Sequence, residues 1–269
     1  MELSGKHVVI TGAASGIGAG LAARFHAEGA TVVAADRDGD GAAQVAAGLE
    51  QARPGSAIAV TADIGSEAGN VALIEAATEQ FGPIDLFFAN AGIGGGTSLD
   101  TPEADWQRAY DVNINAHRWA AKHLVPEWVA RGEGYFCSTA SAAGLLSQIG
   151  SAPYTITKHA AVAFAEWLSI TYGDQGIRVS CLCPQGVNTN MLKGSGDQSI
   201  VRMGAAVVRS AGKVLEPSDV ADVAVEVIRN ETFLILPHPE VLTYLQRKTG
   251  DVDRWLAGMR KLQARMTDS

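Results

Sequence analysis

Short apolar runs alternate with longer helical stretches along most of this 269-residue chain, and this alternation constrains the fold more than any other feature. The runs are apolar almost throughout rather than at every second position, as in strands that are covered on both faces. Repeated strand–helix units of this kind predict an α/β fold, a doubly wound, Rossmann-type parallel sheet with helices on both faces. The strand-like runs are residues 7–11, 30–36, 57–63, 83–92, 134–141, 176–186 and 232–237.

No linker, low-complexity spacer or change in composition divides the chain, so we expect a single domain over residues 1–269. Residues 188–216 are less regular, are rich in Gly and Ser, and interrupt the alternation after the sixth strand. Because insertions at the carboxyl end of a strand often carry function, we expect a substrate-binding lid there. The apolar pattern of residues 238–269 predicts an amphipathic C-terminal helical tail.

Charge and composition narrow the class of partner. The formal net charge is −8 and the basic residues do not cluster, which argues against a surface for nucleic acid. Cys137, Cys181 and Cys183 are interpreted as reduced thiols, and neither they nor the six histidines have the spacing of a metal site. The chain begins directly with a strand pattern, and no apolar run is long enough to cross a bilayer. We therefore expect a cytoplasmic protein with a small-molecule ligand and no metal, nucleic-acid or membrane partner.

A glycine-rich turn, TGAASGIG, joins the first predicted strand to the first predicted helix. Gly12, Gly16 and Gly18 allow a sharp turn and a close approach of the backbone to a ligand. The free N–H groups at the helix start, with Ser15 and Ile17 on either side of Gly16, could then donate to a pyrophosphate. A turn of this kind can also be purely structural, so the next strand has to decide between the two interpretations.

Asp36 ends the second predicted strand, eighteen residues after Gly18, where a ribose-binding carboxylate belongs in a dinucleotide fold. A carboxylate there accepts hydrogen bonds from the adenosine ribose and repels a 2′-phosphate. Juxtaposed like charges cost several kcal/mol, which corresponds to a preference for NAD of roughly 100-fold. Arg37 could pair with a 2′-phosphate and keeps NADP as the less favoured alternative.

Tyr154 and Lys158, in SAPYTITKHA, are four residues apart and lie on one face of a predicted helix. Taken alone, such a pair is more often two unrelated surface residues. Ser151 can cap this helix and Pro153 suits its first turn, which places Tyr154 just inside the N-terminus. The positive end of the helix dipole favours a phenolate at that position.

The spacing Gly-x-x-x-Gly-x-Gly resembles that of the short-chain dehydrogenase/reductase family, in its single-domain branch. Other marks of that family follow in order: Asp63, NAG at residues 90–92, Asn113 in DVNINA, Ser141 in STASAAG, and the pair Tyr154 and Lys158. The thirteen residues from Ser141 to Tyr154 also match. The resemblance spans roughly residues 6–189 and implies an NAD(P)-dependent enzyme that acts on CH–OH donors.

The resemblance assigns the cofactor contacts by position. Asp63 and Ile64 would flank the adenine ring, and the floor near the cofactor's ribose would be formed by Asn90, Ala91 and Gly92. The nicotinamide would be bordered by Pro184, Gly186, Val187 and Thr189, with its carboxamide held by Val187 and Thr189. The family usually has Pro-Gly after the sixth strand, whereas this chain has Pro184-Gln185-Gly186, which brings a bulky polar residue beside the nicotinamide.

The resemblance also implies a catalytic set of Asn113, Ser141, Tyr154 and Lys158. Hydride transfer between a carbinol and nicotinamide requires a proton to move on or off the oxygen, and a free tyrosine has a pKa of about 10. The Lys158 ammonium is expected to lower the pKa of Tyr154 and to donate to the nicotinamide ribose. Ser141 would hold the substrate oxygen, and Asn113 would hold a water that links Lys158 to solvent.

Apolar residues near the expected substrate pocket favour a hydrophobic secondary alcohol or its ketone as the substrate. The predicted substrate contacts are Ile93, Ser141, Leu146, Gln185, Met191 and Leu192. One alternative, an NADPH-dependent carbonyl or 3-ketoacyl reductase, is kept open by Arg37. A non-catalytic nucleotide-binding regulator is a further, less favoured alternative. For assembly, the resemblance implies a homotetramer or a homodimer.

Overall fold

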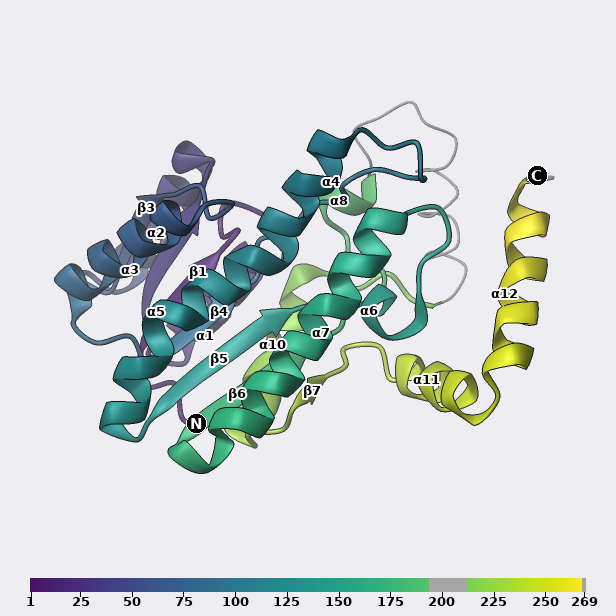
Figure 1. Cartoon of the computed structure of the whole chain (residues 1–269). Coiled ribbons are helices and arrows are strands. Elements are labelled where there is room, and N and C mark those ends of the chain that lie inside the picture. Colours follow the sequence, from purple (N-terminus) through teal and green to yellow (C-terminus); the bar gives the residue numbers. More distant parts are fainter. Residues whose placement is uncertain (194–211, 268–269) are drawn as a thin grey trace.

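The structure, a computed structural model, describes residues 1–193 and 212–267. Within these residues, a seven-stranded parallel sheet has the strand order β3-β2-β1-β4-β5-β6-β7 (Figure 1). This order confirms the predicted doubly wound, Rossmann-type sheet. The strands are β1 (His7–Thr11), β2 (Thr31–Asp36), β3 (Ala57–Thr61), β4 (Leu86–Ala89), β5 (Gly134–Thr139), β6 (Ile177–Leu182) and β7 (Leu234–Ile235).

Helices cover both faces of the sheet because successive side chains of a strand point to opposite sides. Val9, Phe87 and Phe136 belong to the core on the side of α3 (Glu67–Phe81), α5 (Ala116–Arg131) and α7 (Ala152–Tyr172). Val8 and Phe88 belong to the core on the other side, with α1 (Gly16–Ala27), α2 (Gly39–Ala52) and α10 (Pro217–Arg229). The two layers of helices are therefore held by alternate residues of the same strands.

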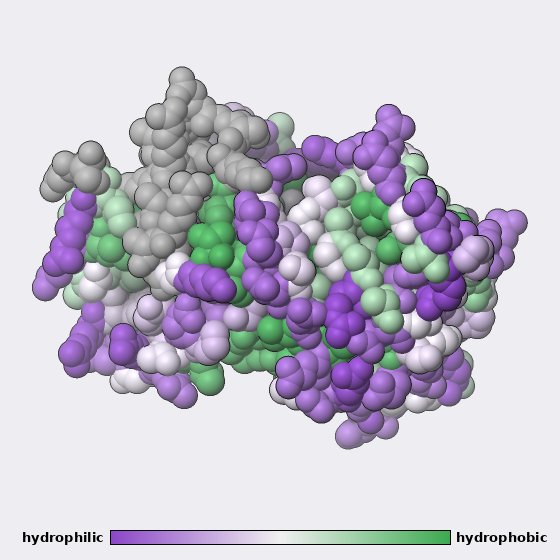
Figure 2. Space-filling view, turned by 180° about the vertical axis from the view of Figure 1, so that it is seen from behind, coloured by the Kyte–Doolittle hydropathy of each residue, from purple (hydrophilic) through white to green (hydrophobic). Residues whose placement is uncertain are grey.

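The outer surface of this second layer is polar, as the amphipathic pattern of its helices requires. In α10, Val220, Ala224 and Ile228 are fully buried, whereas Asp222 and Glu226 are exposed. The view from behind shows mainly hydrophilic residues at the periphery, with hydrophobic residues in smaller groups between them (Figure 2). Among the described residues, no helix is both long and apolar enough to cross a membrane.

The helical stretch between the fourth and fifth predicted strands is divided into three parts in the structure. The structure has α4 (Glu103–Tyr110), then a π-helical turn η1 (Asp111–Asn115), and then α5. The wider turn contains Asn113, which is fully buried. Single π-helical turns inside α-helices often occur at functional sites, and this one directs a polar side chain into the protein.

Of the expected lid, residues 188–216, the structure describes the two ends. After β6, the chain forms α8 (Asn190–Lys193), and it is described again from Gly212, where Leu215 forms a bridge with Val187. The middle of the expected lid, residues 194–211, lies outside the described residues. The predicted C-terminal tail contains α11 (Glu240–Gly250), which packs near α6 (Ala143–Leu146), and α12 (Val252–Thr267), which leads away from the sheet (Figure 1).

Candidate active site

The order of the strands reverses at β1, because β2 and β3 lie on one side of it and β4 to β7 on the other. The chains that follow β1 and β4 therefore diverge to opposite faces and leave a crevice at the carboxyl ends of the strands. A cavity of about 400 Å³ lies there. Of the predicted cofactor contacts, all but Gly186 and Val187 line this cavity.

The glycine-rich turn forms one side of the cavity, and its geometry requires glycine. Gly12 and Gly16 have φ values of 69° and 55°, in the left-handed region that favours glycine. A Cβ on Gly12 would lie 2.8 Å from the Cα of Ala91, and one on Gly16 would lie 3.0 Å from Cγ2 of Thr189. A Cβ on Gly18 would overlap the carbonyl oxygen of Gly12. The turn is thus packed against the loops that follow β4 and β6.

The start of α1 is suited to an anion. Ser15 occupies the N-cap position but makes no side-chain hydrogen bond to the helix, and the first turn contains no acidic residue. The first N–H groups of a helix carry partial positive charge and need acceptors. Together with the close approach that Gly12 and Gly16 permit, these groups fit the pyrophosphate of a dinucleotide.

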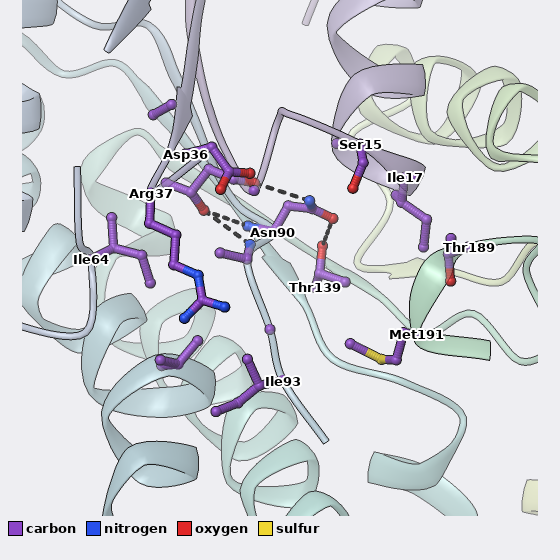
Figure 3. A pocket seen from close by; sticks show the side chains of 18 of the residues that line it. Ser15, Ile17, Asp36, Arg37, Ile64, Asn90, Ile93, Thr139, Thr189 and Met191 are labelled. Atoms are coloured by element: carbon purple, nitrogen blue, oxygen red, sulfur yellow. Dashed lines mark hydrogen bonds between the residues drawn. The ribbon is translucent and has the colours of Figure 1, made fainter. Parts of the chain in front are cut away.

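Asp36 lies at the end of β2 on the wall of the cavity (Figure 3). Its Oδ2 accepts a hydrogen bond from the N–H of Ala14 at 3.1 Å, and its Oδ1 accepts one from the N–H of Asp38 at 3.0 Å. These two bonds orient the carboxylate, whose remaining lone pairs can accept the hydroxyls of a ribose. The side chain of Arg37 extends from the end of the same strand along the cavity (Figure 3).

Arg108 is a residue of the cavity that the sequence analysis missed. It lies on α4, and its two terminal nitrogens donate to the carboxylate of Asp63 at 3.0 and 3.3 Å. This ion pair holds the pKa of Asp63 below its usual value. Asp63 and Ile64 both line the cavity, as the resemblance implied. No spacing in the sequence points to Arg108, because its partner lies on a different loop, 45 residues away.

Asn90 joins three strands beneath the cavity (Figure 3). Its side-chain Nδ2 donates to the carbonyl of Thr11 at 3.0 Å, and its Oδ1 accepts from the hydroxyl of Thr139 at 3.1 Å. The Thr11 hydroxyl accepts from the N–H groups of Asn90 and Ala91 at 2.9 and 3.1 Å. This network fixes the ends of β1, β4 and β5 relative to one another, so the floor of the cavity is rigid.

Asn113 holds the loop that follows β4. Its Oδ1 accepts from the N–H of Ile93 at 2.8 Å, and its Nδ2 donates to the carbonyl of Ile93 at 2.9 Å and to the hydroxyl of Thr157 at 3.0 Å. The side chain does not line the cavity. In this structure, the amide of Asn113 is thus engaged by protein groups, and it ties α7 to the loop that carries Gly92.

Lys158 reaches the cavity from α7 and is 2% exposed. Its ammonium donates to the carbonyl of Thr139 at 2.8 Å, and a Cβ on Gly92 would lie only 3.1 Å from it. Burial lowers the pKa of Lys158 to about 8. A lysine that is buried without an acidic partner is costly, and such groups concentrate at functional sites.

Tyr154 lines the same cavity, with the Lys158 ammonium 5.7 Å from the centre of its ring. Burial raises the pKa of Tyr154 above its ordinary value, and a hydrogen bond with Ser141 acts in the opposite direction. We expected Lys158 to lower this pKa. The protein alone does the opposite, because the loss of solvent around the phenol outweighs the other contributions.

The entry of α7 also differs from the expectation. Ser151 occupies the N-cap position, but its side chain makes no capping bond to the helix. Its hydroxyl instead donates to the carbonyl of Gly96 at 2.7 Å. The helix start is therefore tied to the loop after β4, and Tyr154 is positioned through this contact and through Thr157, which accepts from Asn113.

The predicted substrate contacts are only partly brought together. Ile93 and Met191 line the cavity, whereas Ser141, Leu146, Gln185 and Leu192 do not. Ser141 is 7% exposed, and its hydroxyl accepts from the N–H of Ala143 at 3.1 Å. The amide oxygen of Gln185 is buried on the side of Gly212 and has no hydrogen-bond partner among the described residues.

The crevice at the switch point, the glycine-rich turn and the Tyr154–Lys158 pair define the class of protein, a dinucleotide-dependent oxidoreductase. The sequence pattern of the family described as short chain dehydrogenase matches residues 6–199, and the chain belongs to this family. Within the described residues, there is no group of three or more His, Cys, Asp or Glu side chains that could hold a metal ion.

Individual relatives cover nearly the whole chain. The chain is 35% identical to 1-deoxy-11-beta-hydroxypentalenate dehydrogenase of Streptomyces exfoliatus, over 94% of this chain and 90% of that protein. It is 34% identical to meso-2,3-butanediol dehydrogenase of Serratia marcescens, over 83% of this chain and 87% of that protein. A solved short-chain dehydrogenase/reductase from Burkholderia phymatum, in complex with NAD, superposes with a TM-score of 0.86 at 32% identity, over 94% of this chain and 96% of that one. The protein is thus a short-chain NAD(P)-dependent oxidoreductase of alcohols or ketones.

Proposed function

We propose that this protein interconverts a hydrophobic secondary alcohol and its ketone with NAD(H), with Tyr154 as the acid/base. The observation that carries the proposal is the position of Tyr154 and Lys158 in one cavity with the glycine-rich turn and Asp36. A scaffold that only bound nucleotide would have little physical reason to bury a lysine there. A non-catalytic regulator is therefore the less favoured alternative.

The residues of the chain divide the work as follows. Bound NAD⁺ would supply the acceptor for the hydride that leaves the carbinol carbon. In alcohol oxidation, the Tyr154 phenolate takes the hydroxyl proton, and in ketone reduction the phenol returns it. Ser141 holds the phenolic oxygen of Tyr154 by a hydrogen bond and can hold the substrate oxygen with it. Lys158 would donate to the nicotinamide ribose and keep positive charge near the phenolate.

The ionisation of Tyr154 favours one direction in the protein alone. Because burial raises its pKa, the residue is a neutral phenol at neutral pH. A phenol is ready to donate a proton to a developing alkoxide, which is the reductive role. We therefore expect the ratio of ketone reduction to alcohol oxidation to fall as the pH rises above neutral.

NAD(H) is the preferred cofactor in this proposal because Asp36 faces the cavity where the adenosine ribose would lie. The relative from Burkholderia phymatum that binds NAD supports this choice. Arg37 supports the second candidate, an NADPH-dependent carbonyl or 3-ketoacyl reductase, because its side chain also lines this end of the cavity. Asp36 carries the larger weight, since its carboxylate would repel a 2′-phosphate.

The hydrophobic substrate is supported by Ile93 and Met191, which line the cavity. The relatives named for hydroxypentalenate and butanediol are dehydrogenases of hydroxylated small molecules, which supports the reaction class more than a particular substrate. The start of the segment 188–216, at Thr189, Asn190 and Met191, borders the cavity as the base of a substrate-binding lid would. The proposed lid and the C-terminal tail, residues 238–269, would be parts of the one domain.

A homotetramer or homodimer is also proposed, with α7 in the interface. Trp167 and Ile170 on this helix are 51% and 84% exposed. Because these residues are three apart on a helix, their side chains lie side by side, and adjoining exposed apolar surface of this kind supports an interface. Cys137, Cys181 and Cys183 are buried free thiols, which supports the proposed location in the reducing cytoplasm.

The experiment is a spectrophotometric assay at 340 nm, a wavelength at which NADH and NADPH absorb. NAD⁺ and NADP⁺ are each paired with aliphatic, aromatic, alicyclic and steroid secondary alcohols, and NADH and NADPH with the ketones. We expect turnover with NAD(H) and the best rates with apolar substrates. Equal or better turnover with NADP(H) would favour the second candidate, and nucleotide binding without turnover over the whole panel would favour the regulator.

A further inference from the structure

His238 follows β7 and is 2% exposed, and both of its ring nitrogens contact backbone groups. Its Nδ1 accepts from the N–H of Gln185 at 3.2 Å. Its Nε2 lies 3.1 Å from the carbonyl oxygens of Gly186 and Lys213. Because a backbone N–H can only donate, Nδ1 carries no proton, and the proton on Nε2 is given to the two carbonyls. These contacts define the tautomer of the His238 ring.

The imidazole of His238 replaces one backbone hydrogen-bond acceptor in the pairing of β6 with β7. The N–H of Cys181 donates to the carbonyl of Phe233 at 2.7 Å, and the N–H of Cys183 donates to that of Ile235 at 2.9 Å. In this register, the next N–H, that of Gln185, would meet the carbonyl of Pro237. It donates to the side chain of His238 instead. The strand can therefore end and turn toward the cavity without leaving a buried N–H unpaired.

The same side chain closes a neck, which we define as residues 185–188 together with residues 213–216. Gly186 precedes the segment 188–216 and Lys213 lies near its end, and His238 donates to the carbonyls of both. The N–H of Leu215 also donates to Gly186 at 2.9 Å, and that of Asn188 donates to Leu215 at 2.8 Å. The neck is therefore a small hydrogen-bonded unit with His238 on one side of it.

The neck is connected directly to the active-site residues. The carbonyl of Pro184, which lines the cavity, accepts from the N–H of Ala142 at 2.8 Å and from the hydroxyl of Ser141 at 3.4 Å. Residues 184–186 thus lie between Ser141 on one side and His238 on the other. Thr189, at the far end of this loop, lines the cavity and packs against Gly16.

We propose that His238 is a positioning residue for the nicotinamide end of the cavity. It holds the backbone of residues 185–186 in register with Ser141 and clamps the neck, so that Pro184 and Thr189 keep their places on the cavity wall. This inference rests on the proposed function in one respect, the assignment of that end of the cavity to nicotinamide.

Two substitutions distinguish the roles of the two ring nitrogens of His238. Asn in place of His238 keeps an acceptor near the position of Nδ1, and Gln keeps a donor near the position of Nε2. Binding of NADH and NADPH is measured by calorimetry for His238→Ala, His238→Asn and His238→Gln, together with kcat and KM for the best substrate. We expect His238→Ala to weaken binding of the preferred nucleotide about tenfold, in line with the loss of one buried hydrogen bond to a positioned group. His238→Asn should recover most of this affinity, and His238→Gln should recover less of it.

The matched control is His7→Asn, because His7 is also buried, at 3%, and contacts a backbone carbonyl, that of Gly82, at 2.9 Å. It lies at the opposite end of the sheet and should lower the melting temperature without changing nucleotide affinity. The inference is wrong if all three His238 variants bind nucleotide as the wild type does, or if they lose affinity only as far as His7→Asn does. Nucleotide affinity that follows the predicted order while no substrate turns over would uphold the positioning role and contradict the proposed reaction. A wild type that bound neither nucleotide would contradict both.

Discussion

The two ends of the cavity are built in different ways. At the phosphate end, the residues that would recognise a nucleotide come from short segments. Gly12, Gly16 and Gly18 belong to one turn, and Asp36, at the end of the next strand, accepts from the N–H of Ala14 in that turn and from that of Asp38, two residues away. At the other end, the contacts join residues far apart in the chain. Lys158 donates to Thr139, 19 residues away, and His238 accepts from Gln185, 53 residues away. This difference indicates that the residues for nucleotide binding can be recognised in short sequence segments. The positions of the catalytic side chains, in contrast, depend on contacts that form only in the folded chain.

The largest expected effect comes from a substitution that disrupts the phosphate end of the cavity. Gly18→Ala places a Cβ on the carbonyl oxygen of Gly12, so the turn must open, and the affinity for NADH should fall about 1,000-fold, or about 4 kcal/mol. Gly48→Ala on α2 is the control, because nothing lies within 4 Å of its added Cβ. That variant should bind normally and be slightly more stable, since Ala is the better helix former. Titration calorimetry measures the NADH affinity of both variants. Normal binding by Gly18→Ala would contradict the proposed role of the glycine-rich turn in binding the nucleotide.

The next prediction concerns the buried ammonium at the assembled end. The pKa of Lys158 is lowered from 10.5 to about 8, so the unfolded chain keeps its proton over a pH range in which the folded protein has lost it. The free energy of unfolding should therefore rise between pH 8 and pH 10.5, by about 3 kcal/mol relative to Lys158→Met. Urea unfolding of both proteins without nucleotide measures the difference. A difference that does not change with pH would show that the ammonium is solvated.

A third prediction concerns the preference for NAD⁺ over NADP⁺, which we attribute to Asp36. Asp36→Asn removes the charge that repels a 2′-phosphate and leaves Arg37 in place. The ratio of NAD⁺ to NADP⁺ in kcat/KM should fall by about 30-fold, or about 2 kcal/mol. The control is Asp38→Asn, because the side chain of Asp38 caps α2. This substitution should leave the ratio unchanged. If Asp36→Asn left the ratio as it is, the carboxylate would not face the ribose.

The smallest expected effect concerns Arg108. Arg108→Gln removes the ion pair that orients Asp63, and since both groups are partly exposed the loss is modest. We expect the affinity for NADH to fall about fivefold, or about 1 kcal/mol, with kcat unchanged. An equal fall in kcat would mean that Arg108 affects the catalytic end as well.

The same contrast explains what could be predicted from the sequence. The parallel sheet, the glycine-rich turn and Asp36 follow from residue patterns within short windows, because sterics and strand length act locally. Arg108 and His238 left no such pattern, since each depends on a partner in another loop. The capping role of Ser151 was wrong for a related reason. Its hydroxyl had a choice of partners, and the loop at Gly96 came within reach only in the folded chain.

Two further differences arise from burial, which a sequence shows poorly. The π-helical turn at Asn113 is stabilised by its bonds to Ile93 and Thr157, so it depends on tertiary contacts rather than on local preference. The raised pKa of Tyr154 reflects how completely the folded chain removes solvent from the phenol. Sequence spacing identified the residue but not the sign of its shift.

The central claim is that Tyr154 moves the proton while the rest of the cavity binds the nucleotide. Its most direct test is Tyr154→Phe, with kcat measured at 340 nm and the NADH dissociation constant measured by calorimetry. We expect kcat to fall by about 1,000-fold or more, as the loss of a positioned acid/base does, with a dissociation constant within about threefold of the wild type. Turnover that survives the substitution would contradict the claim.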